Sequence, residues 1–224
     1  MVEKAHGKTV KTLIVQEEEI VSLGLRCAVE QMPEAVLVGE VRDGRTAVAT
    51  AIEQRVQLVL IDIVLRELDG IQATKLIKEA IPAKIIIVTA QQNATDVIAG
   101  FVAGADAYCM RDVSAVQLIK VIRAILAGGV WLDSAVAFVA RGLPGPEADP
   151  TAQAMARLTN KLSRRERQVL QLLAAGLTNQ EIAARLSVGQ ETIKTHVRHL
   201  MDKLGVTDRT QAAVRAVAYG WLDP

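Results

Sequence analysis

Four polar residues in the first half of the chain end or closely follow short apolar runs. Asp62 and Thr89 each end a run, and Glu17 and Arg111 stand just beyond two others. A carboxylate at the end of an apolar strand is costly to bury unless it is used, so we expect Asp62 to be functional. Asp62 and Glu17 together offer the carboxylate oxygens that Mg²⁺ prefers. The alternative, carboxylates satisfied by local backbone donors, applies more readily to Glu17 than to Asp62.

The apolar runs that carry these residues predict strands of one sheet. Three of them are continuous stretches of leucine and β-branched residues, which is typical of strands covered on both faces. Amphipathic stretches with helical spacing separate the runs, and the last begins at Ser114 and stops at Gly128. Five βα units in sequence predict an α/β fold, a doubly wound five-stranded parallel sheet. The predicted strands are Thr12–Val15, Ala35–Glu40, Leu58–Asp62, Lys84–Thr89 and Ala107–Met110.

In such a sheet the carboxyl ends of the strands meet at one edge, where ligands bind at the point of topological reversal. We therefore expect Glu17, Asp62, Thr89 and Arg111 to gather in one crevice.

The rest of the chain predicts a linker and a small helical domain. Residues 142–151 contain three prolines and two glycines, which excludes a continuous helix or a central strand. Beyond them, Ser163 and Thr178 each begin a capping box, Gly205 ends a third helix, and Thr207 is the predicted cap of a fourth. Four short helices in this length predict an all-α helix-turn-helix domain. The predicted division is a first domain at 1–127, a linker at 128–157 and a helical domain at 158–224.

The third helix of that domain separates an apolar face from a basic one. Its inward positions are Ile193, Val197, Leu200 and Leu204. Lys194 and Arg198 share the outer face with Glu191, Thr195 and His199. Cations for phosphates and short polar side chains for base edges are what docking in the major groove of DNA requires. A solvated helix face is the alternative interpretation of these residues alone.

Charge distribution and composition narrow the class of protein. Residues 1–150 carry 15 Lys and Arg against 19 Asp and Glu, whereas residues 151–224 carry 11 against 6. A basic module behind an acidic one is compatible with a nucleic-acid partner. We find no apolar run long enough to span a membrane, no signal peptide and no motif of a nucleotide-binding or hydrolytic enzyme, so we expect a cytoplasmic protein that is not an enzyme.

Residues 10–127 resemble the receiver domain of response regulators. The resemblance implies that Asp62 is the phosphoacceptor and that Glu17, Asp62 and the carbonyl of Val64 hold Mg²⁺. It also implies that Thr89 binds the phosphoryl group and that Tyr108 is an aromatic switch residue. The matching stretches are Leu58-Val-Leu-Ile-Asp-Ile, Leu68-Asp-Gly-Ile, Val88-Thr-Ala and Gly104-Ala-Asp-Ala-Tyr108.

The receiver pattern is broken at three places around the same site. Gln16 stands where the family usually has a second acid, Arg111 where it has a lysine, and Leu65-Arg66 where a Met-Pro pair is usual. Loss of an acid weakens a magnesium site, and the planar guanidinium of arginine is not equivalent to an ammonium. We expect Arg111 to pair with Asp62 directly and Arg66 to occupy the place of the metal. These three departures predict a receiver that works without phosphorylation. The alternative is the conventional phosphorylation switch, in which Glu18 helps to hold the metal.

Residues 158–222 resemble the LuxR-type helix-turn-helix, and the whole chain resembles the NarL/FixJ family of response regulators. The resemblance implies that Lys194, Thr195 and Arg198 contact double-stranded DNA. It also implies that the last helix, with Ala212 and Ala216, forms a homodimer surface. A sensor histidine kinase is a further possible partner. The matching stretches are Leu162-Ser-Arg-Arg-Glu-Arg-x-Val-Leu, Gly176-Leu-Thr-Asn-x-Glu-Ile-Ala, Glu191-Thr-Ile-Lys-Thr-His-Val and Lys203-Leu-Gly-Val-x-Asp-Arg-Thr.

Two rival functions remain at this point. A receiver-containing adaptor would bind a protein through its helical domain, and charge reversal at Lys194 and Arg198 would leave that role intact. A redox sensor would use Cys27 or Cys109, but both lie in apolar runs and are expected to be core residues. His196 and His199 have metal-ligand spacing without a third ligand in view, which argues against a metal site.

Overall fold

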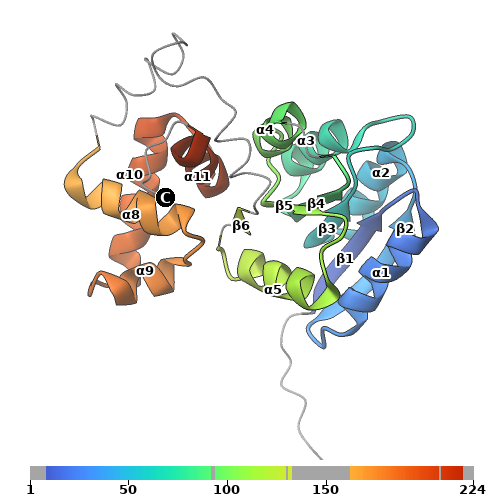
Figure 1. The fold of residues 1–224 in the computed structure, drawn as a ribbon, viewed down its shortest axis with the longest axis horizontal. Helices are drawn as coiled ribbons and strands as arrows, with labels where there is room; N and C mark the ends of the chain where they lie inside the picture. Colours follow the sequence, from blue (N-terminus) through green and yellow to red (C-terminus); the bar gives the residue numbers. More distant parts are fainter. Residues whose placement is uncertain (1–8, 92–93, 130, 133–161, 207, 219–224) are drawn as a thin grey trace, which may run out of the picture.

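A computed structural model describes residues 9–91, 94–129, 131–132, 162–206 and 208–218 of the chain. Its first part is a parallel sheet in the order β2-β1-β3-β4-β5-β6, which places β1 between β2 and β3 (Figure 1). The doubly wound parallel sheet is thus confirmed, and strand boundaries agree with the predicted ones to within two residues. The strands are β1 (Val10–Val15), β2 (Ala35–Val41), β3 (Leu58–Ile61), β4 (Lys84–Thr89), β5 (Ala107–Met110) and β6 (Trp131–Leu132).

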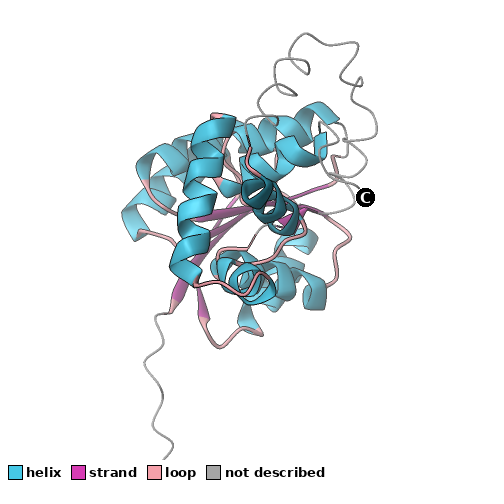
Figure 2. Cartoon of the chain, turned by 90° about the vertical axis from the view of Figure 1, so that its left-hand side faces the viewer, coloured by secondary structure: helices cyan, strands magenta, loops and turns pink. Residues whose placement is uncertain are grey.

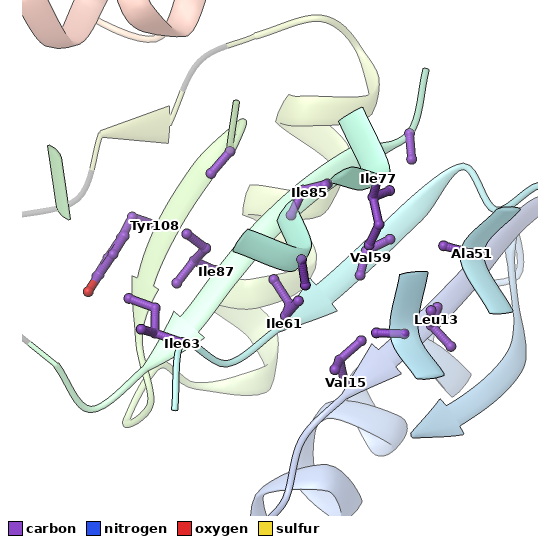
Figure 3. Packing of buried hydrophobic residues seen from close by; sticks show 14 of the residues in the cluster. Leu13, Val15, Ala51, Val59, Ile61, Ile63, Ile77, Ile85, Ile87 and Tyr108 are labelled. Atoms are coloured by element: carbon purple, nitrogen blue, oxygen red, sulfur yellow. The ribbon is translucent and has the colours of Figure 1, made fainter. Parts of the chain in front are cut away.

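Helices cover the sheet on both faces, so its central strands are buried as their composition predicts (Figure 2). One apolar cluster joins the inward side chains of α2, α3 and α4 to strand residues that include Ile61, Ile87 and Tyr108 (Figure 3). The second joins those of α1 and α5 to strand residues that include Ile14 and Ile86. The helices are α1 (Glu19–Glu30), α2 (Gly44–Gln54), α3 (Gly70–Ala80), α4 (Ala94–Val102) and α5 (Ala115–Leu126).

The sixth strand corrects the predicted linker. Trp131 and Leu132 form β6, which pairs in parallel with Ala107 and Tyr108 of β5. A two-residue strand has too little periodicity to be predicted from sequence, because it depends on the unpaired edge of β5. In the part of the chain that the structure describes, the sheet therefore has six strands rather than the predicted five, and two residues of the range predicted as a linker, 128–157, belong to it. The proline-rich part of that range lies outside the described residues.

The second part is a small helical domain with its own core. Ser163 and Thr178 form complete capping boxes with Glu166 and Glu181, as predicted. Gly205 ends the third helix in the left-handed conformation, at φ 61°. Thr207, the predicted cap of the last helix, lies outside the described residues, but the Asp208 carboxylate accepts a hydrogen bond from the Gln211 amide there. The helices are α8 (Arg164–Ala174), α9 (Asn179–Arg185), α10 (Gln190–Leu204) and α11 (Arg209–Ala218).

Candidate functional site

Asp62 lies at the carboxyl end of β3 and is only 2% exposed. Its Oδ2 atom accepts hydrogen bonds from Gln16 Nε2 at 3.1 Å and from Arg111 Nη2 at 3.0 Å. Its Oδ1 atom accepts the Val64 amide at 3.3 Å. The predicted direct pairing of Arg111 with Asp62 is confirmed. A carboxylate this deeply buried is stabilised only because cationic and neutral donors surround it.

Arg111 joins Asp62 to the surface of the crevice. Its Nη1 atom donates to Glu18 Oε1 at 2.6 Å, so the guanidinium bridges a buried and an exposed carboxylate. Burial alone would lower the pKa of Arg111, but its hydrogen bonds to Glu18 and Asp62 outweigh burial and raise that pKa. Arg111 is therefore a fixed positive charge beside Asp62, and Glu18 is engaged by it rather than turned toward a metal.

The second predicted metal ligand is also engaged by an arginine. Glu17 pairs with Arg66, as expected for an arginine that occupies the place of a metal. Receiver domains generally bind Mg²⁺, but in this arrangement both carboxylates are held by arginines, and Val64 turns its amide N–H toward Asp62. Among the described residues no three His, Cys, Asp or Glu side chains are grouped as metal ligands. The residues present thus do not fit a magnesium ion without rearrangement of two arginines.

Thr89 and Tyr108 are connected through one residue that the sequence did not single out. The Gln91 amide donates to Thr89 Oγ1 at 3.3 Å, and the Tyr108 hydroxyl donates to the Gln91 carbonyl at 2.8 Å. Both Thr89 and Tyr108 are fully buried. Burial, with the nearby charges of Asp96 and Asp62, raises the pKa of Tyr108, which keeps its hydroxyl protonated as a donor. The Tyr108 ring also lies 6.3 Å from that of Phe101 on α4.

The predicted DNA-binding residues lie together on the outer face of α10. The apolar side chains Ile193, Val197, Leu200 and Leu204 are buried, as predicted. The opposite face holds exposed side chains, and two of them interact, with Lys194 Nζ 2.6 Å from Glu191 Oε1. The Thr195 hydroxyl donates to the Glu191 carbonyl at 3.1 Å. The exposed set is Glu191, Lys194, Thr195, Arg198 and His199.

Three expectations about side-chain placement need correction. Ala212 and Ala216 are fully buried in the core of the helical domain, so in this structure they cannot contact a second copy of the chain. Alanine is too short to reach past its own helix once that face is packed. Cys27, expected in the core, is exposed on α1, whereas Cys109 is buried as expected.

The outer face of α11 packs against α4 of the first part, and the two helices lie side by side (Figure 1). Val214 is 7% exposed and joins the apolar cluster that contains Phe101 and Tyr108. Asp208, which directly precedes α11, is half-buried there. Partial burial raises the pKa of Asp208 and Asp106 raises it further, while the Gln211 amide and Lys78 oppose the shift.

A second contact brings the start of α10 close to the end of α5. A pocket of about 260 Å³ there is lined by residues of both parts, among them Gly128, Lys194 and Arg209. Arg209 Nη2 donates to the Leu177 carbonyl at 2.7 Å, and its Nη1 donates to Asn179 Oδ1 at 3.2 Å. Burial lowers the pKa of Arg209 to about 10. The N-terminal end of α10, the helix that carries the predicted DNA-binding residues, therefore faces the first part of the chain.

Two family models match the chain, one for each part. Residues 12–123 match the response regulator receiver domain, and residues 160–216 match the bacterial regulatory proteins of the luxR family. The fold and the crevice thus define a receiver joined to a LuxR-type DNA-binding domain.

Relatives with the same organisation extend over nearly the whole chain. The transcriptional regulatory protein LiaR of Bacillus subtilis is 33% identical, over 92% of this chain and 96% of LiaR. The response regulator protein VraR of Staphylococcus aureus is 32% identical, over 96% and 99%. The chain belongs to the NarL/FixJ family of two-component response regulators, which bind DNA through a LuxR-type helix-turn-helix.

A solved structure of the response regulator RcsB in complex with DNA covers 93% of this chain and 99% of its own. Its sequence is 23% identical to this chain and the TM-score is 0.55, so the likeness shows a shared fold and nothing further. Within the described ranges, we find no helix of the length and apolarity needed to cross a membrane.

Proposed function

We propose that this transcription regulator has a receiver that works without a phosphoryl group on Asp62. The observation that carries the proposal is the buried ion pair between Arg111 and Asp62. An aspartate that accepts a phosphoryl group needs a carboxylate oxygen that is free to attack the phosphorus atom. The charge that the phosphoryl group adds must then be neutralised by a metal and by cations that reorganise around it. Here Arg111 already neutralises the carboxylate, so the unmodified site has the charge balance that phosphorylation and Mg²⁺ together supply elsewhere.

The neighbouring contacts support the same proposal. Gln16 donates to Asp62 where a second acid would instead attract a cation, and Arg66 pairs with the remaining acid, Glu17. The planar guanidinium of an arginine donates its hydrogen bonds in fixed directions, whereas the ammonium of a lysine rotates freely. The pair therefore holds the crevice in one arrangement, whose Thr89 and Tyr108 are linked through Gln91.

We propose that α10 is the helix that enters the major groove of double-stranded DNA. Lys194 and Arg198 contact phosphates, while Thr195, Glu191 and His199 lie where side chains reach base edges. The exposure of all five residues on one face supports this assignment. Because DNA is the partner, we place the protein in the cytoplasm.

We further propose that the DNA-bound form is a homodimer, since symmetric proteins read symmetric half-sites. A dimer contact through α11 has to use its outer face, which includes Val214 and which α4 covers in this structure. Dimerisation through α11 therefore requires the two domains to separate. A sensor histidine kinase is a partner only under the alternative, a conventional phosphorylation switch.

Mass spectrometry after incubation with Mg²⁺ and a small phosphodonor tests the receiver proposal. The wild-type chain should gain no phosphoryl mass, and Asp62→Asn should bind DNA as the wild type does. A variant with Gln16→Asp and Arg111→Lys restores the usual family residues and should gain one phosphoryl group if those two positions block the reaction. Adding Asp62→Asn to that variant is the control, because it removes the acceptor.

A stoichiometric gain of mass by the wild type would contradict the proposal if Asp62→Asn abolished it. Tighter DNA binding by the modified chain would then establish the conventional switch.

A further inference from the structure

Glu166 is an almost completely buried acid with partners on two helices of the DNA-binding domain. It is 4% exposed and lies in the first turn of α8. Its Oε2 atom accepts the Ser163 amide at 2.7 Å and Lys203 Nζ at 2.8 Å. Burial alone would raise the pKa of Glu166, but the hydrogen bonds from Lys203 and Ser163 lower it to about 2. Glu166 is therefore an anion at any working pH.

The contact with Lys203 connects the start of α8 to the end of α10. Lys203 lies in the last turn of α10, where a cation is stabilised by the helix dipole, and Glu166 lies in the first turn of α8, where an anion is. The two residues are 37 positions apart in the sequence, so the contact is purely tertiary. It fixes the end of α10 that lies opposite its base-reading end.

The residue before Glu166, Arg165, contacts α9, the helix that precedes α10 in the chain. Its Nη2 atom donates to the Leu186 carbonyl at 3.0 Å, at the C-terminal cap of α9. Two consecutive side chains at the start of α8 thus hold the C-terminal ends of both α9 and α10.

A small tilt at the Lys203 end moves the reading end by a distance that matters for recognition. Lys203 and Thr195, a proposed base-edge contact, are separated by eight residues of α10, or about 12 Å along a helix that rises about 1.5 Å per residue. A tilt of about 5° over that length moves Thr195 by about 1 Å, and precise sites need placement to within about 0.5 Å.

We propose that Glu166 is a positioning residue for DNA recognition, acting through Lys203 to set the tilt of α10. Without that contact the basic face keeps its charge, so general attraction to DNA remains while sequence-specific contacts weaken. The inference rests on the proposed role of α10 as the reading helix.

The chain offers a matched control for this inference. Glu181 occupies the same position in the second capping box, where it accepts the Thr178 amide at 2.7 Å and the Thr178 hydroxyl at 2.8 Å. It is exposed, and within the described ranges we find no lysine or arginine paired with it. Glutamine can still accept the cap hydrogen bonds at either position, so only Glu166→Gln removes a charged contact between helices.

The test compares the affinity of the full chain for a duplex selected from random sequence with its affinity for an unrelated duplex, over a range of salt. Glu166→Gln should lower specific affinity about tenfold, the size of one lost base contact, and leave non-specific affinity within about twofold. Glu181→Gln should leave the ratio unchanged. Lys203→Met should reproduce the loss, Lys203→Arg should retain the wild-type ratio, and the double variant Glu166→Gln, Lys203→Met should be no worse than either single one.

Equal ratios for Glu166→Gln and Glu181→Gln, with both chains folded, would overturn the inference. So would an equal loss of specific and non-specific binding by Lys203→Met, with a salt slope reduced by about one, because Lys203 would then be a phosphate contact. If Glu166→Gln does not fold, the two Lys203 variants decide, since they leave the cap intact. Alanine variants of Lys194 and Arg198 without effect on DNA binding would instead refute the reading role of α10 itself.

Discussion

Replacing Val214 by aspartate should separate the two domains without unfolding either. Val214 is 7% exposed and packs with the apolar cluster of the receiver rather than with the core of its own domain. Full burial of a valine side chain contributes about 1.5–3 kcal/mol, and an aspartate there also carries the cost of desolvating its charge. The closed arrangement, in which α11 packs against α4, should therefore lose at least about 2 kcal/mol. That is about a 30-fold change in the ratio of closed to open chains.

Two measurements check this prediction. Small-angle scattering should give a larger radius of gyration for Val214→Asp than for the wild type, because the domains are no longer held together. The apparent DNA affinity should rise by up to about 30-fold, with the closed fraction of the wild type setting the limit. Val116→Asp is the matched control, since Val116 is 62% exposed on α5 and its replacement should change neither quantity.

Two results would refute the reasoning. An unchanged radius and affinity would mean that the contact between α11 and α4 does not hold the domains together. Loss of the helical domain's cooperative unfolding transition would mean that Val214 belongs to the core of that domain instead.

Four further predictions follow from close contacts and charges. A Cβ added at Gly70 would lie 1.9 Å from the backbone carbonyl oxygen of Asp62. Gly70→Ala should therefore lower the free energy of unfolding of the receiver by about 3 kcal/mol, measured by thermal unfolding. Gly24→Ala, with nothing within 4 Å of its Cβ, should stabilise α1 by about 0.5–1 kcal/mol. The Asp106 carboxylate accepts hydrogen bonds from the ammonium groups of Lys78 and Lys84 at 2.6 Å and from the Ile85 amide at 2.9 Å. Asp106→Asn should therefore lower the free energy of unfolding, measured by urea denaturation, by about 3 kcal/mol. A loss below about 1 kcal/mol would show that these contacts do not stabilise the receiver. Alanine at Lys194 or Arg198 should weaken binding to all DNA sequences and lower the salt slope by about one per lost contact, and unchanged binding by the folded double variant would contradict the DNA assignment.

The elements of the fold were predictable because their signals are local. Apolar runs such as Ile85–Val88 are fully buried strands, and the capping boxes at Ser163 and Thr178 bond within three residues along the chain. The gathering of Asp62 and Arg111 in one crevice was predictable too, since the ends of parallel strands share one edge of the sheet.

The short strand β6 was not predictable, because its pairing depends on the exposed edge of β5 rather than on its own residues. The exposure of Cys27 was missed for a related reason, since an apolar neighbourhood in sequence does not say which face of a helix is covered.

The amino-acid sequence by itself determined two domains, the type of each, and the residues that crowd the crevice and the outer face of α10. Only the tertiary structure decided which of those residues pair. Glu166 meets Lys203 across 37 residues, Val214 of α11 lies against the receiver, and Ala212 turns into its own core. Such contacts depend on how helices pack against one another, and packing is set by the complementary shapes of whole faces rather than by any short stretch of chain.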